Sequence, residues 1–216
     1  MSFSISPPAR GLVPVLILLA LLQPAPARAQ GQANDPDWPC AQVYASELSI
    51  AQVWKGEFPA PKTAWYTDPE IAPLVPKLAS RALPIERAKE EIAALAAGLP
   101  PQQRRAKLLL LFQGLFEYID GERRRTLQRI RKYGRSQKAL VERILAQSEE
   151  IERLEAEQAD GPRLAQLKET REMNLRVFDD RRRMQRYICE QPDVLQKRIF
   201  DLALLVRAQL AREKAP

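Results

Sequence analysis

The residue types that most often carry out chemistry are scarce in this chain of 216 residues. It has no histidine and only two cysteines, Cys40 and Cys189. Without histidine the chain cannot build a Ser–His–Asp or Cys–His catalytic group, a histidine-liganded zinc site or a histidine switch near neutral pH. Two cysteines are too few for a four-cysteine metal site or an iron–sulfur cluster. The eight glycines form no phosphate-binding motif. We therefore expect no metal site and no cofactor.

Carboxylates are the remaining candidates for catalysis. Most of them follow solvent-facing helical patterns, and adjacent acids such as Glu149 and Glu150 point to different sides of a helix. Glu117 lies beside Tyr118 in an apolar stretch, and it is the one carboxylate that burial could turn into a proton donor near neutral pH. We expect it to reach solvent or an arginine instead. The sequence therefore argues against an enzyme, and a carboxylate-based hydrolase is the remote alternative.

The two cysteines favour a disulfide bond if the chain is exported to an oxidising compartment. A Cys40–Cys189 bridge would close a loop of about 150 residues, for which the loop-entropy model gives at most about 5 kcal/mol of stabilisation. The alternative is a reactive thiol pair. It is disfavoured because redox-active cysteines usually lie close together in C-x-x-C motifs.

Residues 1–29 have the pattern of a secretory signal peptide. Arg10 supplies the positive charge, Leu12–Leu22 is an apolar run, and Ala27–Ala29 fits a cleavage site, so we predict cleavage after Ala29. The run is shorter than the roughly 20 apolar residues of a membrane-spanning helix. An uncleaved N-terminal anchor is the alternative. We expect an extracytoplasmic protein, periplasmic or secreted, that has no transmembrane segment after cleavage.

Residues 30–68 are predicted to form an irregular strap, rich in aromatic residues and proline, that lies across a helical core. An aromatic recognition groove is the alternative interpretation. One short helix is expected here, from Ile50 to Lys55, with Ser49 as its N-cap and Gln52 completing a capping box.

Helical patterns follow from Asp68 onward, and no run alternates as a β-strand would, so the predicted fold class is all-α. Asp68 and Pro69 predict the start of a short helix, and Pro84 begins a helix that ends at Gly98. The most apolar helical segments are expected to form a small bundle, and the last residues a disordered tail. The bundle comprises residues 69–121 and 192–212, and the tail residues 213–216.

Residues 122–189 are predicted to form a long, projecting antiparallel hairpin of coiled-coil type. The proline-free stretch 102–160 predicts one long helix, with Gly134 as a plausible bend. Its apolar residues narrow to a stripe beyond Gly121, at the three- and four-residue spacing of a helical seam. Residues 160–162, Asp-Gly-Pro, predict the turn, and Pro192 predicts a break in the returning helix.

Charge gives the most distinctive pattern of this hairpin. Residues 123–138 contain eight Lys or Arg and no acid, whereas residues 142–160 contain seven acids and two bases. Four further arginines are expected to lie level with the basic segment on the returning helix. We call these twelve residues the basic belt: Arg123, Arg124, Arg125, Arg129, Arg131, Lys132, Arg135, Lys138, Arg181, Arg182, Arg183 and Arg186.

The basic belt has two competing interpretations. It is either a solvated helix face whose arginines pair with nearby carboxylates, or a docking site for an acidic protein, a lipid headgroup or an envelope polymer. Nucleic acid is disfavoured as a partner, because an exported protein seldom meets it and no nucleic-acid-binding motif is present.

These observations favour a non-enzymatic scaffold or adaptor that binds another envelope protein or an anionic component through its hairpin. The alternative is a holdase chaperone of the envelope. On plan and charge alone, a basic exported protein with paired helical arms resembles the trimeric hairpin chaperone of the periplasm, which implies that oligomers are possible.

Overall fold

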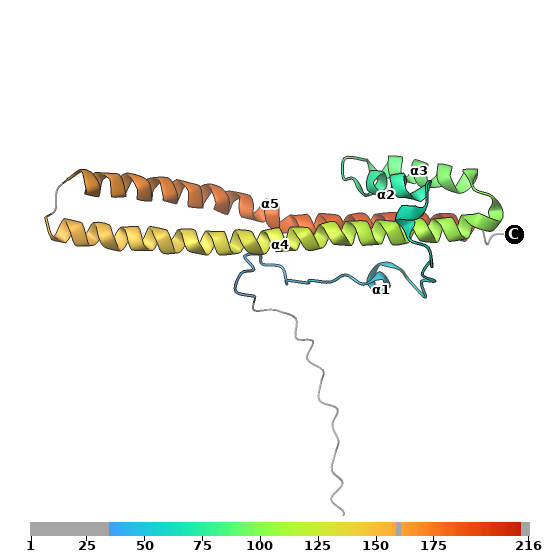
Figure 1. The fold of residues 1–216 in the computed structure, drawn as a ribbon, viewed down its shortest axis with the longest axis horizontal. Coiled ribbons are helices and arrows are strands. Elements are labelled where there is room, and N and C mark those ends of the chain that lie inside the picture. Colours follow the sequence, from blue (N-terminus) through green and yellow to red (C-terminus); the bar gives the residue numbers. More distant parts are fainter. Residues whose placement is uncertain (1–34, 159–160, 213–216) are drawn as a thin grey trace, which may run out of the picture. The chain divides into compact units, whose positions relative to one another are not determined.

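The fold is all-α, as the sequence predicts. The computed structural model describes residues 35–158 and 161–212, and over these residues it contains five α-helices, one short 3-10 helix and no strand (Figure 1). The predicted signal peptide and the predicted C-terminal tail lie outside the described residues. None of the described helices is both long and apolar enough to cross a membrane. The elements are α1 (Ile50–Val53), η1 (Trp65–Thr67), α2 (Ile71–Ala79), α3 (Ile85–Gly98), α4 (Pro101–Ala156) and α5 (Pro162–Arg212).

Two long helices, α4 and α5, run antiparallel and pack against each other (Figure 1). Helix α4 has 56 residues, which corresponds to about 84 Å at 1.5 Å per residue. The helix is continuous through Gly134, the position where the sequence suggests a bend. The described part of the strap as far as α1 lies on one side of the helix pair, and α2 and α3 lie on the other (Figure 1).

Helix α5 continues through Pro192, so the break predicted there is wrong. A proline inside a helix removes one backbone hydrogen bond and costs about 3 kcal/mol. Pro192 is buried, and the side-chain amide of Gln191 donates to the carbonyl of Tyr187 at 3.0 Å. The disulfide at Cys189 and the buried residues from Ile199 onward hold the helix on both sides of this position. These contacts therefore offset the cost of Pro192 inside the helix. The sequence pattern around the proline does not reveal such contacts.

The core forms where α2 and α3 cover the apolar beginning of α4 and the end of α5. Phe112 is fully buried at its centre, in contact with the rings of Trp54 and Phe58 from the strap, at centroid distances of 4.5 and 5.3 Å. The prediction that this apolar part of α4 is buried is therefore confirmed. The largest fully buried side chains around Phe112 are Ile71, Val75, Leu78, Ile92, Leu108, Leu111, Leu115, Ile119, Ile199 and Leu202.

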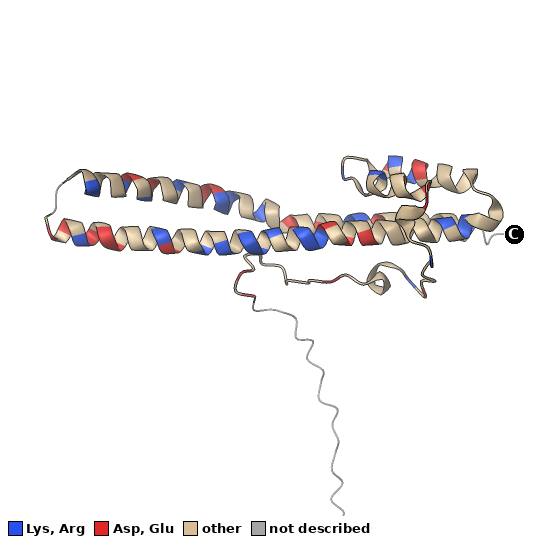
Figure 2. Cartoon of the chain, in the orientation of Figure 1, with Lys and Arg blue, Asp and Glu red and all other residues tan. Residues whose placement is uncertain are grey.

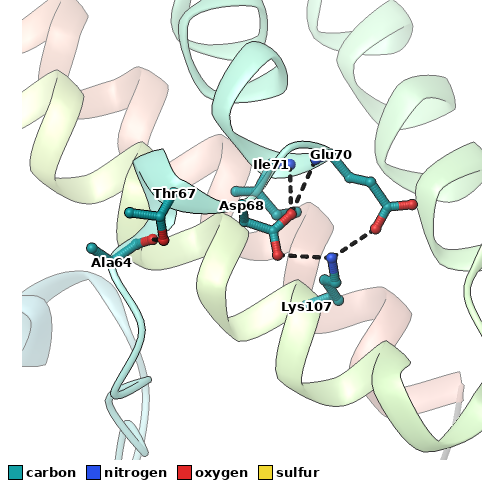
Figure 3. A network of polar contacts seen from close by, with 6 residues as sticks. All are labelled: Ala64, Thr67, Asp68, Glu70, Ile71 and Lys107. Carbon is teal, nitrogen blue, oxygen red and sulfur yellow. Dashed lines mark hydrogen bonds and ion pairs between the residues drawn. The ribbon is translucent and has the colours of Figure 1, made fainter.

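Helix α2 begins two residues later than predicted, because Asp68 acts before the helix rather than as its immediate cap. The Asp68 carboxylate accepts the backbone N–H groups of Glu70 and Ile71, both at 3.1 Å. Lys107 of α4 donates to the carboxylates of Asp68 and Glu70, both at 2.7 Å (Figure 3). Burial alone would raise the pKa of Asp68, but the hydrogen bonds from Lys107 and from the backbone lower it. This network fastens the start of α2 to α4.

The short strap helix α1 has the predicted start and an earlier end. The side chain of Gln52 accepts the backbone N–H of Ser49 at 2.7 Å, as the capping-box pattern predicts. The helix ends at Val53 rather than at Lys55. Trp54, the residue after the helix, has an extended backbone, and its ring packs in the core beside Phe112.

Candidate functional site

The strap is fastened to the middle of the long helices by the predicted disulfide. Cys40 and Cys189 are bonded, with their Cα atoms 5.6 Å apart. Beside the bridge, the amide of Gln185 donates to the carbonyl of Pro39. Gln185 and Cys189 both belong to α5. The neighbouring strap residues contact α4 instead.

Gly134 is the point where the strap backbone reaches α4. A Cβ atom on this residue would overlap the carbonyl oxygen of Asp37, and it would lie 3.2 Å from the ring of Pro39. Only glycine allows this approach. The glycine that the sequence suggests as a bend is therefore a contact site for the strap.

Two strap carboxylates neutralise one face of the basic belt. Asp35 pairs with Arg131 at 2.7 Å, and Asp37 pairs with Arg135 at 2.9 Å. Lys138 donates to the carbonyl of Pro36 and lies 3.8 Å from the Asp37 carboxylate. The hydrogen bond from Arg135 lowers the pKa of Asp37. Arg131, Arg135 and Lys138 therefore hold the strap, and their charges are matched within the chain.

Arg123 is buried, so the expectation that it faces a partner is wrong. Its side chain donates to the carbonyl of Ala45 at 2.6 Å, and only 4% of the residue is exposed. Nearby Asp120 is 5% exposed, and one of its carboxylate oxygens has no hydrogen-bond partner among the described residues. Burial raises the pKa of Asp120, against the charges of Arg124 and Arg123.

Asp120 is a buried carboxylate that the sequence reasoning missed. A usable signal was its spacing: Phe116, Asp120, Arg123 and Leu127 follow one another at intervals of four, three and four, which places all four on one helix face. Both apolar members of that row are buried. The two charged members interrupt an otherwise apolar row, and this would have indicated buried charge.

Several other residues of the belt pair with neighbours on their own helix. Arg124 lies 3.4 Å from the Asp120 carboxylate, and Arg186 lies 3.0 Å from that of Glu190. Arg125 pairs with Glu122, and Arg183 with Asp180. Apart from the pair with the buried Asp120, these are exposed pairs, which contribute only about 0.2–1 kcal/mol each and remain accessible to competing anions.

Apart from the buried Arg123, four residues of the belt have no carboxylate partner among the described residues, and we call them the unpaired cations: Arg129, Lys132, Arg181 and Arg182. The guanidinium of Arg181 donates to Ser136 Oγ at 2.9 Å, and the other three make no ion pair in the described part of the chain. Arg129, Lys132 and Arg182 are exposed, and Arg181 is half-buried. Figure 2 shows the concentration of Lys and Arg along the middle of α4.

The acidic end of the hairpin is matched in part by bases of α5. Glu150 pairs with Arg163 at 2.8 Å, and Glu155 pairs with Lys168 at 2.6 Å. The hydrogen bond from Arg153 lowers the pKa of Glu150. This pairing across the helices leaves the distal end less strongly negative than the sequence of α4 alone indicates.

The one carboxylate proposed as a catalytic candidate lies in an exposed position. Glu117 accepts hydrogen bonds from Trp65 Nε1 at 2.9 Å and from the amide of Gln113 at 2.8 Å. It is therefore a surface anchor for the indole ring of η1, and the burial that would make it a proton donor is not present. Among the described residues, no group of acidic or cysteine side chains is arranged to hold a metal ion.

Comparison of the chain with protein-family models, with curated proteins and with solved structures finds no match.

Proposed function

We propose that this chain is a non-enzymatic, extracytoplasmic helical scaffold or adaptor, which binds an acidic envelope protein through α4 and α5. The observation that carries the proposal is the division of the basic belt. The strap neutralises Arg131, Arg135 and Lys138, whereas Arg129 and Lys132 on the same helix have no carboxylate partner among the described residues. Uncompensated like charges repel one another in the free protein, and an anionic partner removes this repulsion.

The disulfide supports the extracytoplasmic part of the proposal. Structural disulfides form and persist in oxidising compartments and are rare in the cytosol of most organisms. The bridge fixes the strap and α5 to each other at Cys40 and Cys189, close to the belt. The bridge would thereby hold the strap on the cations that it pairs with, so that the unpaired cations stay available while a partner binds.

Charge reversal on two faces of the same helix tests the proposal. Affinity capture from an envelope extract is compared for the wild type, for Arg129→Glu with Lys132→Glu, and for Arg135→Glu with Lys138→Glu. The first variant is expected to lose at least about tenfold of the captured partner, since it replaces attraction by repulsion. The second carries the same change of net charge and is expected to retain it. An unchanged partner set for the first variant would contradict the proposal.

A second candidate function is a holdase chaperone of the envelope, favoured by exposed apolar side chains on the helical arm. Met173, Met184 and Tyr187 are 58%, 53% and 60% exposed. Flexible methionine side chains suit the binding of varied apolar segments. This function requires suppression of the aggregation of unfolded clients, and by the likeness to the trimeric chaperone it requires oligomers. A monomer by light scattering that leaves aggregation unchanged would exclude it.

A further inference from the structure

Four exposed apolar side chains form a row along α5. Met173, Val177, Met184 and Tyr187 are 58%, 37%, 53% and 60% exposed. Their spacing of four, seven and three residues places them on one face of the helix. Single exposed apolar residues are ordinary, but several large ones aligned on one helix face indicate an interaction surface. We call these four residues the apolar row.

The described part of the strap, residues 35–68, does not cover the apolar row. Near the row it contacts α5 at Gln185 and Cys189, and its contact of Trp54 with Arg207 lies beyond the row along the helix. At about 100° per residue, Gln185 and Cys189 lie more than roughly 100° around the helix from the middle of the row. The row therefore belongs to a face of the hairpin that the described part of the chain leaves open.

The apolar row leads into a cavity at the junction of α2, α4 and α5. Ile188 and Gln191, which follow Tyr187 along α5, line this cavity of about 600 Å³. Its walls also include Arg81, after α2, and Arg129, of α4, neither of which forms an ion pair among the described residues. The open face therefore has a socket at one end, and this socket combines apolar walls with two guanidinium groups and with the Glu122 carboxylate, which is itself paired with Arg125.

Cations follow the apolar row on its α4 side. The hydrogen bond of Arg181 to Ser136 shows which face of α4 adjoins this side of α5. Arg129, Lys132 and Arg143 share that face, since they lie seven and four residues before Ser136 and seven residues after it. All three are exposed and lack a carboxylate partner in the described ranges. The apolar row is thus bordered by positive charge.

We propose that this open face docks an amphipathic helix of a partner protein, with acidic residues flanking its apolar stripe. This inference rests on the proposed adaptor function and adds the docking face and the partner's chemistry. The row spans about 21 Å, or four helical turns, which a helix of roughly 15–20 residues would cover as the third member of a bundle. The partner's acids would pair with Lys132 and Arg143, and its end would enter the socket beside Arg129.

The charges on this face favour a helix over the other occupants. A second copy of the chain would bring the same basic borders together, which is unfavourable. An anionic lipid surface would meet Asp180, which lies in line with the row between Val177 and Met184 and has a side chain 71% exposed. A carboxylate is repelled by anionic headgroups and is costly to bury in the acyl region. Between helices, one polar residue in an apolar seam is tolerated and sets the register.

Photo-crosslinking in the native host tests the docking face. A crosslinking amino acid replaces Met184 in one variant and Leu145 in the control, which is a similarly exposed apolar residue, 57% exposed, on α4. Adducts are expected from position 184 and not from position 145. Their mapped segment should be a helix with an apolar stripe and net negative charge. Adducts to lipid or to a second copy at position 184, or no adduct there, would overturn the inference.

The two proposals fail in different ways in this experiment. Adducts to another protein from position 145 alone would leave the adaptor function standing and refute the docking face. A lack of protein adducts at both positions would count against both. A second variant, Met184→Asp, is expected to weaken capture of the crosslinked partner at least tenfold, whereas Leu145→Asp leaves it unchanged. Both substitutions are at exposed positions, and unchanged circular dichroism and melting temperature would verify the fold.

Discussion

Replacing Gly134 by alanine isolates the contact between the strap and α4. Gly134 lies inside a long helix, where alanine is favoured over glycine by about 1 kcal/mol. The added Cβ would overlap the carbonyl oxygen of Asp37, and the disulfide at Cys40 prevents the strap from moving away freely. Overpacking of this kind typically costs about 1–3 kcal/mol. The gain and the cost oppose each other, so a matched control is needed.

Gly121→Ala provides that control on the same helix. A Cβ atom there would meet nothing closer than the end of the Arg125 side chain, at 3.9 Å. This variant should gain about 1 kcal/mol in the free energy of unfolding, because only helix propensity changes. Since the propensity gain is common to both variants, their difference reports the overpacking alone.

Urea unfolding, followed by circular dichroism, measures that difference. The Gly121→Ala variant should be more stable than Gly134→Ala by about 1–3 kcal/mol. Limited proteolysis should also cut residues 35–45 faster in the Gly134→Ala variant. Equal stabilisation in both variants, with the strap equally resistant, would show that the strap does not pack on α4 at this position.

Three further perturbations test charged and covalent contacts. Burial raises the pKa of Asp120, so its ionisation destabilises the fold once the pH rises above the pKa of this carboxyl in the unfolded chain. Asp120→Asn should therefore be more stable than the wild type at pH 7. Unfolding curves should show that this difference in stability vanishes below about pH 4. The pKa of Asp68 is lowered, so its contribution to stability is fully present above about pH 4 and is lost progressively as the pH falls below that; Lys107→Met should cost roughly 1.5–3 kcal/mol at pH 7 and progressively less in acid, and a cost that stays constant as the pH falls would refute the pairing. Alkylation and intact mass should find no free thiol, and replacing Cys40 and Cys189 together by alanine should cost up to about 5 kcal/mol in urea unfolding.

Local patterns were sufficient for the fold class, for most helices and for the disulfide. Helix α3 lies where Pro84 and Gly98 predict it, because those residues act on their own backbone. The Cys40–Cys189 bridge followed from the pairing of the two cysteines in a chain whose sequence predicts export.

Features that depend on distant contacts were not predictable in this way. Pro192 is tolerated inside α5 because neighbouring parts of the same helix are held by packing. Gly134 contacts Asp37, a residue far away in the sequence, rather than bending its own helix. Arg123 is buried because it donates to the carbonyl of Ala45, and the helical periodicity of α4 gives no sign of this distant contact.

The basic belt shows the same limit most clearly. Its sequence indicates a block of positive charge, but not which members the strap neutralises. That depends on where Asp35 and Asp37 lie once the disulfide fixes the strap, and they lie against Arg131 and Arg135. Neighbouring cations on the helix therefore differ in role, and Arg129 and Lys132, which the strap leaves unpaired, border the proposed docking face.

Lysine footprinting tests this division most directly, because Lys132 and Lys138 lie six residues apart on α4 and on different faces. Acetylation of both lysines is compared by mass spectrometry in the purified protein and in the native host. The proposed function predicts that Lys132 loses reactivity in the host, where the partner covers it, while Lys138 beside the strap reacts equally in both settings. Equal reactivity of Lys132 in both settings, or protection of Lys138 instead, would contradict it.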